Sequence, residues 1–297
     1  MTQLNLSFNK EEKTNIFTQI NDLFRKIFKT KNSDDFIKFL RFIKRFRNRS
    51  PFNNALVFAQ NPDCYYWATA QEWEKLGRLV KKEARPMVVL QPFSPIVFVY
   101  DYEDTEGKNI TDERLLHWFE EKEDIYFSQK VIDRTIKYLE EEEKIKVIFL
   151  KKGELTETHL SLDDAIGYIS SEKEIVLHPR YSEEKYKIEL YGVLVHEMAH
   201  YYLEHLKNRN YFDRSIKEIE AELTAWIVFS LFGIEKRSEE YLAFWLRTKE
   251  DLEKINMSRI LNVSWKIRNI GLGLVCLLYT SDAADDLLCV DLGGRRI

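Results

Sequence analysis

The spacing of hydrophobic residues in the first hundred positions predicts a mixture of helices and strands. Apolar side chains recur every three or four residues over 34–47, with basic residues between them, which predicts an amphipathic helix. A proline opens the segment 51–60 and suits the first turn of a second helix. Residues 85–91 and 96–102 have the pattern of two paired strands. The N-terminal part of the chain is therefore predicted to be an α+β domain.

The second half of the chain shows short apolar runs followed by longer helical ones. The short runs predict two hairpins, formed by residues 146–150 with 155–160 and by residues 167–170 with 174–178. Helical periodicity precedes these runs over 111–142 and follows them over 183–206, 215–232 and 238–255. The predicted fold class is α+β throughout, with a small antiparallel sheet and helices in the second half.

A polar stretch around Gly107 marks the predicted boundary between two domains, which would span residues 1–105 and 106–274. The remaining residues, 275–297, show neither sustained helical nor sustained strand periodicity. Their sequence looks like read-through of a sequencing adapter. We therefore predict that they are not a native part of the fold.

Composition changes this picture by separating the two halves. The chain has 297 residues, of which 44% are hydrophobic and 32% are charged, and this excludes disordered chains and disulfide-stapled miniproteins. Residues 1–100 carry 17 Lys and Arg against 9 Asp and Glu, so the rest of the chain has a net charge of −12. The asymmetry predicts two halves with different partners.

The expected environment follows from what the sequence lacks. It has no run of about 18 apolar residues, so no membrane partner is expected. The N-terminus shows no apolar core of a secretory signal. The three cysteines, Cys64, Cys276 and Cys289, form no C-x-x-C pair, which favours a reducing compartment. The cytoplasm is the expected location.

The residues His-Glu-Met-Ala-His at 196–200 have the HExxH spacing of a metal-binding helix. Residues four apart lie on one helix face, so His196 and His200 can bind one Zn²⁺ ion. Glu197 then lies beside the ion, where it can act as a general base. Apolar neighbours predict a largely buried helix, in which polar side chains need partners. We therefore predict His196 and His200 as metal ligands and Glu197 as the catalytic residue.

A third protein ligand is expected on the next helix. Glu218 and Glu222 are four residues apart and share one face there. We predict Glu218 as the ligand and Glu222 as a hydrogen-bond acceptor for a ligand histidine. The pattern Ser215-x-x-Glu218 also fits a capping box, so this alternative stays open. The longer histidine pattern of metzincins is absent, and His205 is predicted to be a surface residue near the helix end.

Two histidines and one glutamate leave a coordination position open, which suits hydrolysis of a peptide bond. Glu197 would take a proton from water and deliver it to the leaving amine. The strand 174–178 could bind an extended substrate by strand addition, or it could be an ordinary strand of the sheet. A protein or peptide is the predicted substrate.

Basic residues in the first hundred positions predict a nucleic-acid surface, because single-strand binders combine a basic groove with aromatic side chains that stack on bases. The basic candidates are Arg41, Lys44, Arg45, Arg47, Arg49, Arg78, Lys81 and Lys82. The aromatic candidates are Phe52, Tyr65, Tyr66, Trp67 and Trp73. A solvated helix face above an aromatic core would give the same pattern, and the sequence alone leaves both interpretations open.

Two stretches of the chain resemble a known family. HEMAH followed by EIEAELTAWIVFSLFGI resembles the zincin-like domain of ImmA/IrrE-type metallopeptidases and, more closely, the C-terminal domain of ArdC-type antirestriction proteins. SPFNNALVFAQNP and the basic segment after Trp73 look like the N-terminal domain of ArdC-type proteins. The resemblance implies single-stranded DNA as a partner and Glu218 as the third ligand. The chain departs from the family at 83–85, where a glycine is usual.

The leading hypothesis is a zinc-dependent metallopeptidase fused to a single-stranded-DNA-binding domain, encoded on a mobile element and serving antirestriction or the cleavage of a regulator. One alternative is an antirestriction protein that protects DNA by binding it, without proteolysis. Another is an ImmA/IrrE-like peptidase that cleaves a repressor and does not contact DNA.

Overall fold

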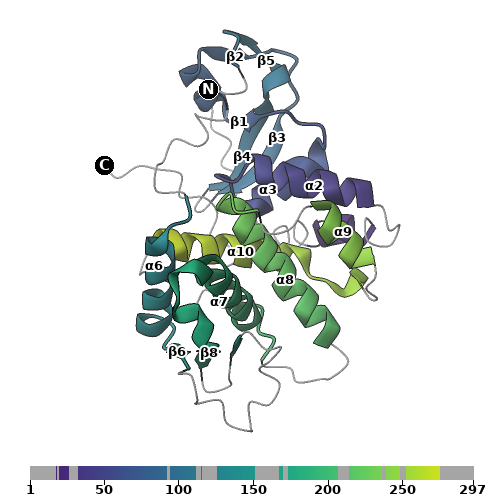
Figure 1. Ribbon diagram of the computed structural model, residues 1–297. Coiled ribbons are helices and arrows are strands. Elements are labelled where there is room, and N and C mark those ends of the chain that lie inside the picture. The colour runs from purple at the N-terminus through teal and green to yellow at the C-terminus, as the bar shows by residue number, and fades with distance from the viewer. Residues whose placement is uncertain are drawn as a thin grey trace. The chain divides into compact units, whose positions relative to one another are not determined.

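The computed structural model describes residues 18, 20–26, 33–91, 94–111, 115, 126–150, 167–169, 173–206, 214–235, 239–247 and 252–274 (Figure 1). These residues form two compact units. Unit 1 contains the described residues up to 115 and those from 239 to 258, and unit 2 contains those from 126 to 235 and from 259 to 274. The predicted domain boundaries at 105 and 274 stay predictions, and the tail 275–297 lies outside the described residues.

Unit 1 combines helices with two small antiparallel sheets. Its helices include α2 (Ser33–Arg45), α3 (Pro51–Gln60), α4 (Ala70–Lys75) and α9 (Glu239–Arg247). Its strands are β1 (Trp67–Ala68), β2 (Arg78–Val80), β3 (Met87–Gln91), β4 (Ser94–Asp101) and β5 (Thr105–Gly107). One sheet has the order β1-β4-β3, and β2 pairs with β5 in the other. The pairing of β3 with β4 confirms the hairpin predicted for this region.

Side-chain amides of α3 occupy the outer edge of β3. The Asn53 amide donates to the carbonyl of Leu90 and accepts from its N–H, at 2.9 and 3.1 Å. Two helical turns further on, Gln60 makes the same pair of bonds to Val88, both at 2.9 Å. An edge strand normally leaves such groups open to pairing with another chain. The two amides therefore close this edge of the sheet, and they give a structural role to the segment NNALVFAQ.

The buried side chain of Arg78 links the two strands of the β2–β5 ribbon. Its guanidinium donates to the hydroxyl and carbonyl oxygens of Thr105, both at 2.7 Å, and to the carbonyl of Lys108 at 2.6 Å. It also lies 3.9 Å from the centre of the Tyr102 ring. Arg78 is only 5% exposed, and these hydrogen bonds provide acceptors for its buried guanidinium. Gly107 closes the ribbon at a φ of 127°, where glycine is favoured.

Replacing Gly107 with alanine is expected to destabilise unit 1 by about 2 kcal/mol or more, because strain adds to a steric clash. A Cβ atom at this position would meet the carbonyl oxygen of Gly77 at 2.6 Å. Gly77→Ala is the matched control, since its φ is 78° but its nearest contact would be an ordinary 3.7 Å. Urea unfolding should show the larger shift in midpoint for Gly107→Ala. Equal shifts would contradict the predicted clash.

The core of unit 1 is aromatic. Phe39 and Phe42 of α2 pack edge to face against Phe58 of α3, and Phe46 packs against Tyr66 and Trp67. The helical spacing of apolar residues over 34–47 predicted this buried face, and α2 confirms it. Thr69 and Glu72 form the reciprocal bonds of a capping box at the start of α4.

Unit 2 contains the HExxH segment and one mixed sheet. Its helices are α6 (Gln129–Glu141), α7 (Lys187–Tyr202), α8 (Arg214–Leu231) and most of α10 (Met257–Leu272). Its strands are β6 (Lys146–Phe149), β7 (Gly167–Ile169) and β8 (Glu174–Leu177), in the order β6-β8-β7. Two short 3-10 turns, Pro179–Ser182 and Glu184–Tyr186, connect β8 to α7.

The sheet of unit 2 departs from the predicted antiparallel arrangement in one strand. β7 and β8 form the expected antiparallel pair, but β6 runs parallel to β8, from Lys146 opposite Glu174 to Phe149 opposite Leu177. The predicted partner of β6 at 155–160 lies outside the described residues. The α+β fold class is confirmed by helices and small sheets in both units.

Helix α10 was not predicted, although it is largely buried in unit 2. Ser264 and Arg268 interrupt its apolar pattern, yet both are buried. Gly271 marks its close approach to α6 and α7. A Cβ atom there would meet Val131 at 2.8 Å and the Tyr191 hydroxyl at 3.1 Å. Figure 1 shows α10 beside α6 and α7.

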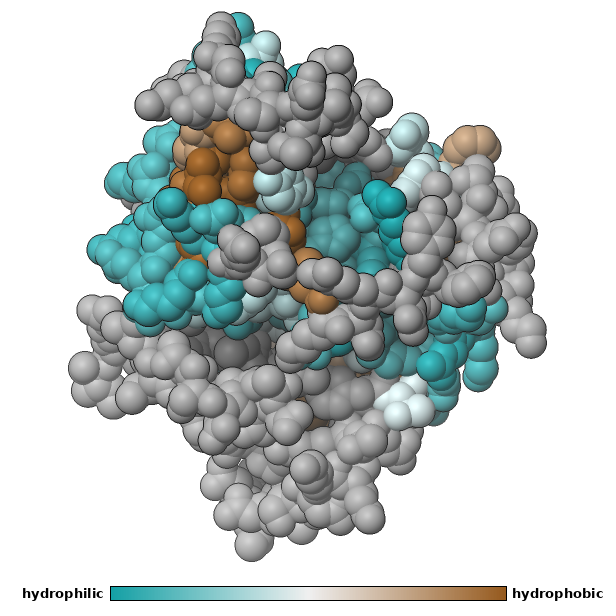
Figure 2. Space-filling view, turned by 90° about the horizontal axis from the view of Figure 1, so that it is seen from below, coloured by the Kyte–Doolittle hydropathy of each residue, from teal (hydrophilic) through white to brown (hydrophobic). Residues whose placement is uncertain are grey.

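The described surface includes several exposed large apolar side chains, among them Leu79, Phe98 and Phe244. On the face drawn in Figure 2, hydrophilic residues lie beside a smaller apolar area. Among the described helices, none is long and apolar enough to cross a membrane.

Candidate metal centre

Helix α7 positions the two histidines of the motif. Leu190, Leu194 and Met198 recur every four residues and are buried, so they fix this face of α7 against the rest of unit 2. His196 and His200 occupy another face, also four residues apart. Their Nε2 atoms lie 3.1 Å from one another. The structure thus brings the two predicted ligands together as their spacing requires.

Helix α8 packs against α7 and brings Glu218 to the same point (Figure 1). Its Oε2 atom lies 3.4 Å from Nε2 of His196 and 3.7 Å from Nε2 of His200. Among the described residues, these three side chains form a group able to hold a metal ion. Glu218 therefore lies where a third metal ligand is expected. A role in capping the helix alone would not require this closeness to the two histidines.

The spacing of the three ligand atoms fits a divalent metal ion. Atoms bound at about 2.0–2.1 Å in a tetrahedral arrangement lie about 3.3–3.4 Å from one another. The three separations of 3.1, 3.4 and 3.7 Å scatter around that value. Imidazole nitrogens and a carboxylate oxygen are ligands typical of such ions.

Charge at the centre agrees with a cation site. Burial on its own lowers the pKa of His196, but hydrogen bonds to Glu218 and Glu222 outweigh it and raise the pKa to about 9. Hydrogen bonds from His196 and His200 hold the pKa of Glu218 well below its ordinary range. The centre therefore favours a positive charge among its ligands, whether a proton or a metal ion.

Glu197 lies on the same helix in a buried position, with 7% of its surface exposed. Burial raises the pKa of Glu197 to about 7, against the opposing effects of His196 and of the Ile169 N–H. That N–H, on β7, donates to Oε2 of Glu197 at 2.9 Å and fixes the carboxylate. A carboxyl group whose pKa lies near neutrality is suited to both accepting and releasing a proton.

The outer nitrogens of the two ligand histidines also have neighbours, a carboxylate of α8 for His196 and the His205 ring for His200. Glu222 Oε2 lies 3.7 Å from Nδ1 of His196, on the side away from Glu218, which agrees with the position predicted for it. The prediction for His205 was wrong. Its side chain is 7% exposed, with Nδ1 at 2.9 Å from Nδ1 of His200 and Nε2 at 2.9 Å from Oε2 of Glu220. The spacing of His205 from the motif gave no signal of this contact.

The structure also decides between the two interpretations of the strand 174–178. β8 is the central strand of its sheet, with β6 on one side and β7 on the other, so it has no open edge for a substrate. It is an ordinary sheet strand. In the part of the sheet that the structure describes, β7 lies at one edge, and its Ile169 N–H bonds to Glu197 beside the centre.

Several basic residues predicted to contact nucleic acid are engaged within unit 1. Arg41 pairs with Glu240 of α9, and Lys44 lies 3.4 Å from Glu239. Arg45 donates to the carbonyl of Tyr65 at 3.2 Å, and Arg47 is half-buried with interactions of its own. Arg49 pairs with Glu72 at 2.9 Å and lies over the Trp67 ring. These contacts give the basic face of α2 and the turn after it a structural role.

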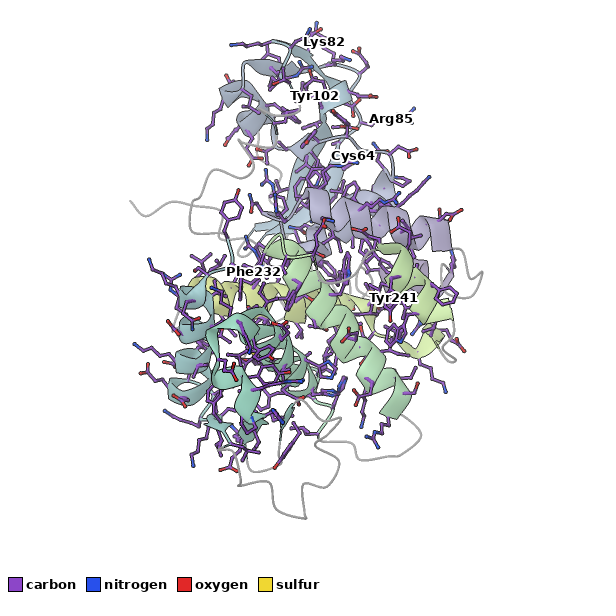
Figure 3. All side chains as sticks on the ribbon, in the orientation of Figure 1. Cys64, Lys82, Arg85, Tyr102, Phe232 and Tyr241 are labelled. Atoms are coloured by element: carbon purple, nitrogen blue, oxygen red, sulfur yellow. The ribbon has the colours of Figure 1, made fainter. Side chains whose placement is uncertain are left out.

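The basic residues around β2 differ in exposure. Arg78 is inside the ribbon and is not available to a ligand. Lys81 donates to the carbonyl of Glu103 at 2.6 Å. Lys82 is exposed, and so is Arg85, which was not among the residues predicted to bind nucleic acid. Figure 3 shows both side chains directed outward from this end of unit 1.

The predicted stacking residues are mostly core. Phe52, Tyr66, Trp67 and Trp73 are all buried, and only Tyr65 is partly exposed. Buried rings cannot stack on bases, so of these five residues only Tyr65 could stack on a base.

The fold and the centre define an α+β protein in which an HExxH helix contributes to a group of side chains able to hold a metal ion. Residues 115–226 match the SprT-like family, and residues 10–155 match the N-terminal domain of the anti-restriction factor ArdC. The two matches overlap at 115–155, and together they confirm the resemblance to ArdC-type antirestriction proteins.

Relatives of the chain extend this comparison. An uncharacterized protein of Bacillus anthracis is 24% identical in an alignment of 270 positions, which covers 76% of this chain and 45% of that protein. The chain therefore spans about half the length of this curated relative. The metal-free crystal structure of antirestriction protein ArdC from plasmid R388 is 10% identical, with a TM-score of 0.38 over 77% of this chain and 86% of that one. Its Mn(II)-bound structure is 14% identical, with a TM-score of 0.37 over 80% and 95%.

Proposed function

We propose that this protein is a zinc-dependent peptidase joined to a single-stranded-DNA-binding domain, and that it serves antirestriction for a mobile element. The observation that carries the enzymatic part is the convergence of His196, His200 and Glu218 beside the buried Glu197. The matches to an ArdC N-terminal domain and to the SprT-like family support the combination of the two parts.

Zinc is the proposed ion because two imidazoles and one carboxylate, with a fourth position open, form a catalytic zinc site. The ArdC protein of plasmid R388 has been crystallised with Mn(II), so manganese is the natural competitor to test. Bound at this centre, such an ion would polarise a substrate carbonyl and make water more acidic.

The residues around the centre have two further roles, which are proton transfer and positioning of the ligand histidines. Glu197, held at one oxygen by the Ile169 N–H, takes a proton from water and returns it to the leaving nitrogen. A pKa near neutrality lets the same carboxyl group perform both transfers. His196 and His200 are kept in place by their contacts with Glu222 and His205. The proposed target is a peptide bond, whose hydrolysis in this way would give a carboxylate and an amine.

The peptidase is tested by metal removal and restoration. Protein stripped with a chelator should lose the ability to produce new N-termini in a host lysate, and one equivalent of Zn²⁺ should restore it. Parallel restoration with Mn²⁺ identifies the preferred ion, and addition of single-stranded DNA shows whether it acts as a trigger. A chain that retains no zinc at equimolar concentration would contradict the proposal.

The proposed DNA surface centres on Lys82 and Arg85, since both are exposed beyond β2 and Figure 3 shows them directed outward. Among the residues that the structure describes, no acid forms an ion pair with either side chain, whereas Arg41 and Arg49 do pair with glutamates. Cations of this kind bind phosphates, and each contact releases a counterion.

Replacing Lys82 and Arg85 with glutamate is therefore expected to weaken binding of single-stranded DNA by about tenfold or more and to flatten its salt dependence by about 0.7 per lost phosphate contact. Fluorescence anisotropy at several salt concentrations measures both effects. The matched control is the double replacement of Lys130 and Lys137 on α6, which are exposed and change the net charge equally. Equal losses in the two double variants would show that only net charge matters.

A further inference from the structure

The end of α7 folds back on the metal-binding histidines. Glu204 adopts a left-handed backbone conformation, with a φ of 60°, and an ion pair of 2.9 Å with Arg259 of α10 holds its side chain. The N–H of His205 then donates to the carbonyl of His200 at 3.0 Å. This helix end turns the His205 ring towards His200, and the two ring centres are 5.0 Å apart. A left-handed residue other than glycine carries strain, so the turn is a position that the surrounding structure must hold.

The contacts of His205 form a chain that ends at α8. Nδ1 of His205 lies 2.9 Å from Nδ1 of His200, and Nε2 of His205 lies 2.9 Å from Oε2 of Glu220. Lys217 donates to the carbonyl of His205 at 3.1 Å and ties the same turn to α8. The side chains of His205 and Glu220 are 7% and 12% exposed, so water competes little with these bonds.

Only one placement of protons satisfies the whole chain when His200 is a ligand. Nε2 of His200 faces His196 and Glu218, so it must offer a lone pair to the ion, and its proton is on Nδ1. That N–H donates to Nδ1 of His205. The remaining proton of His205 is then on Nε2, where it donates to the carboxylate of Glu220. Each group has a donor matched to an acceptor.

We propose that His205 and Glu220 are positioning residues for the metal centre, which fix the ring orientation and the tautomer of His200. The inference rests on the proposed metal site. It adds a chain of hydrogen bonds behind His200 that neither the HExxH motif nor Glu222 provides. Glu222 lies against His196, and the chain through His205 serves the other histidine. The two ligand histidines are thus held by different carboxylates of α8, one directly and one through an imidazole.

The test measures metal affinity rather than peptide cleavage. Zinc binding by the full chain is followed by competition with a chromophoric chelator, for His205→Leu, His205→Asn, Glu220→Gln and the double variant His205→Leu with Glu220→Gln. Loss of an outer hydrogen bond of this kind weakens metal binding by about 10–100-fold, which is the effect expected for His205→Leu. His205→Asn should recover part of it, because its amide oxygen can accept from Nδ1 of His200. Glu220→Gln should weaken binding less.

The double variant separates a chain from two independent effects. Since Glu220 acts through His205, the double variant should bind zinc no more weakly than His205→Leu alone. Glu189→Gln, an exposed change on α7, is the control, and urea unfolding of the metal-free variants checks that each remains folded. The visible spectrum of bound Co²⁺ should shift in His205→Leu, reporting altered ligand geometry.

Zinc affinities within twofold of the unaltered chain, or losses that multiply fully in the double variant, would overturn the positioning role and leave the metal site intact. Absence of zinc binding by the unaltered chain would instead overturn the metal site together with the inference.

Discussion

Glu197→Gln is expected to reduce peptide cleavage by about 10²–10⁴-fold while zinc binding stays close to that of the unaltered chain. Glutamine has nearly the same shape and can still accept from the Ile169 N–H at the oxygen that Glu197 now uses. It cannot take a proton from water, so the step that activates water is lost. Because Glu197 is not among the three proposed ligands, the metal should remain.

The measurement compares initial rates of peptide cleavage in zinc-loaded protein with the zinc content of the same samples. Glu189→Gln provides the control, since it makes the same chemical change at an exposed position of the same helix. Equal cleavage by Glu197→Gln and the unaltered chain would remove Glu197 from the mechanism. Unchanged protection of DNA in a chain that no longer cleaves would favour the alternative of an antirestriction protein without proteolysis.

The metal centre could be predicted from sequence because its geometry is mostly local. His196 and His200 share a face through the pitch of one helix, and this requires no knowledge of the rest of the fold. Glu218 was predicted by requiring a third ligand, and α8 does place it within 3.7 Å of both histidines. The role of Glu218 as a ligand stays a prediction until metal binding is measured.

Contacts that depend on a turn of the chain could not be predicted from helical periodicity. His205 was expected at the surface because it follows the helix, but a left-handed residue at Glu204 reverses the chain and returns the ring to His200. No periodicity encodes a reversal of this kind when the residue is not a glycine. The same limit applies to β6, whose parallel pairing with β8 depends on the path of the intervening chain.

Charge patterns proved ambiguous for a different reason. A basic residue beside an aromatic one suits a nucleic-acid surface, but Arg49 over Trp67 and Arg78 over Tyr102 use that pairing inside unit 1. The acids that neutralise such residues can be distant in the sequence and are then not recognised from it. Arg41, for example, forms an ion pair with Glu240. Burial, which the sequence shows only indirectly, decides which cations remain for a ligand.

Glu218→Ala is expected to weaken zinc binding by more than about 100-fold, beyond the range of changes to residues that only support ligands. The change leaves two protein ligands, and a catalytic site of this kind needs three. Glu222→Ala is the matched control on the same helix face. Its carboxylate lies 3.7 Å from Nδ1 of His196, so its loss should weaken binding by about 10–100-fold only.

Chelator competition on both variants, together with urea unfolding without metal, distinguishes a ligand from a helix cap. A cap contributes about 1 kcal/mol to folding and nothing to metal affinity. If Glu218→Ala lowers the stability of the metal-free protein by that amount but binds zinc as tightly as the unaltered chain, then Glu218 is a cap. In the metal-free state Glu218 accepts from His196 and His200, so the loss of this carboxylate should also lower the pKa of His196 from its raised value of about 9. An NMR titration of the histidine ring follows that change independently of any metal.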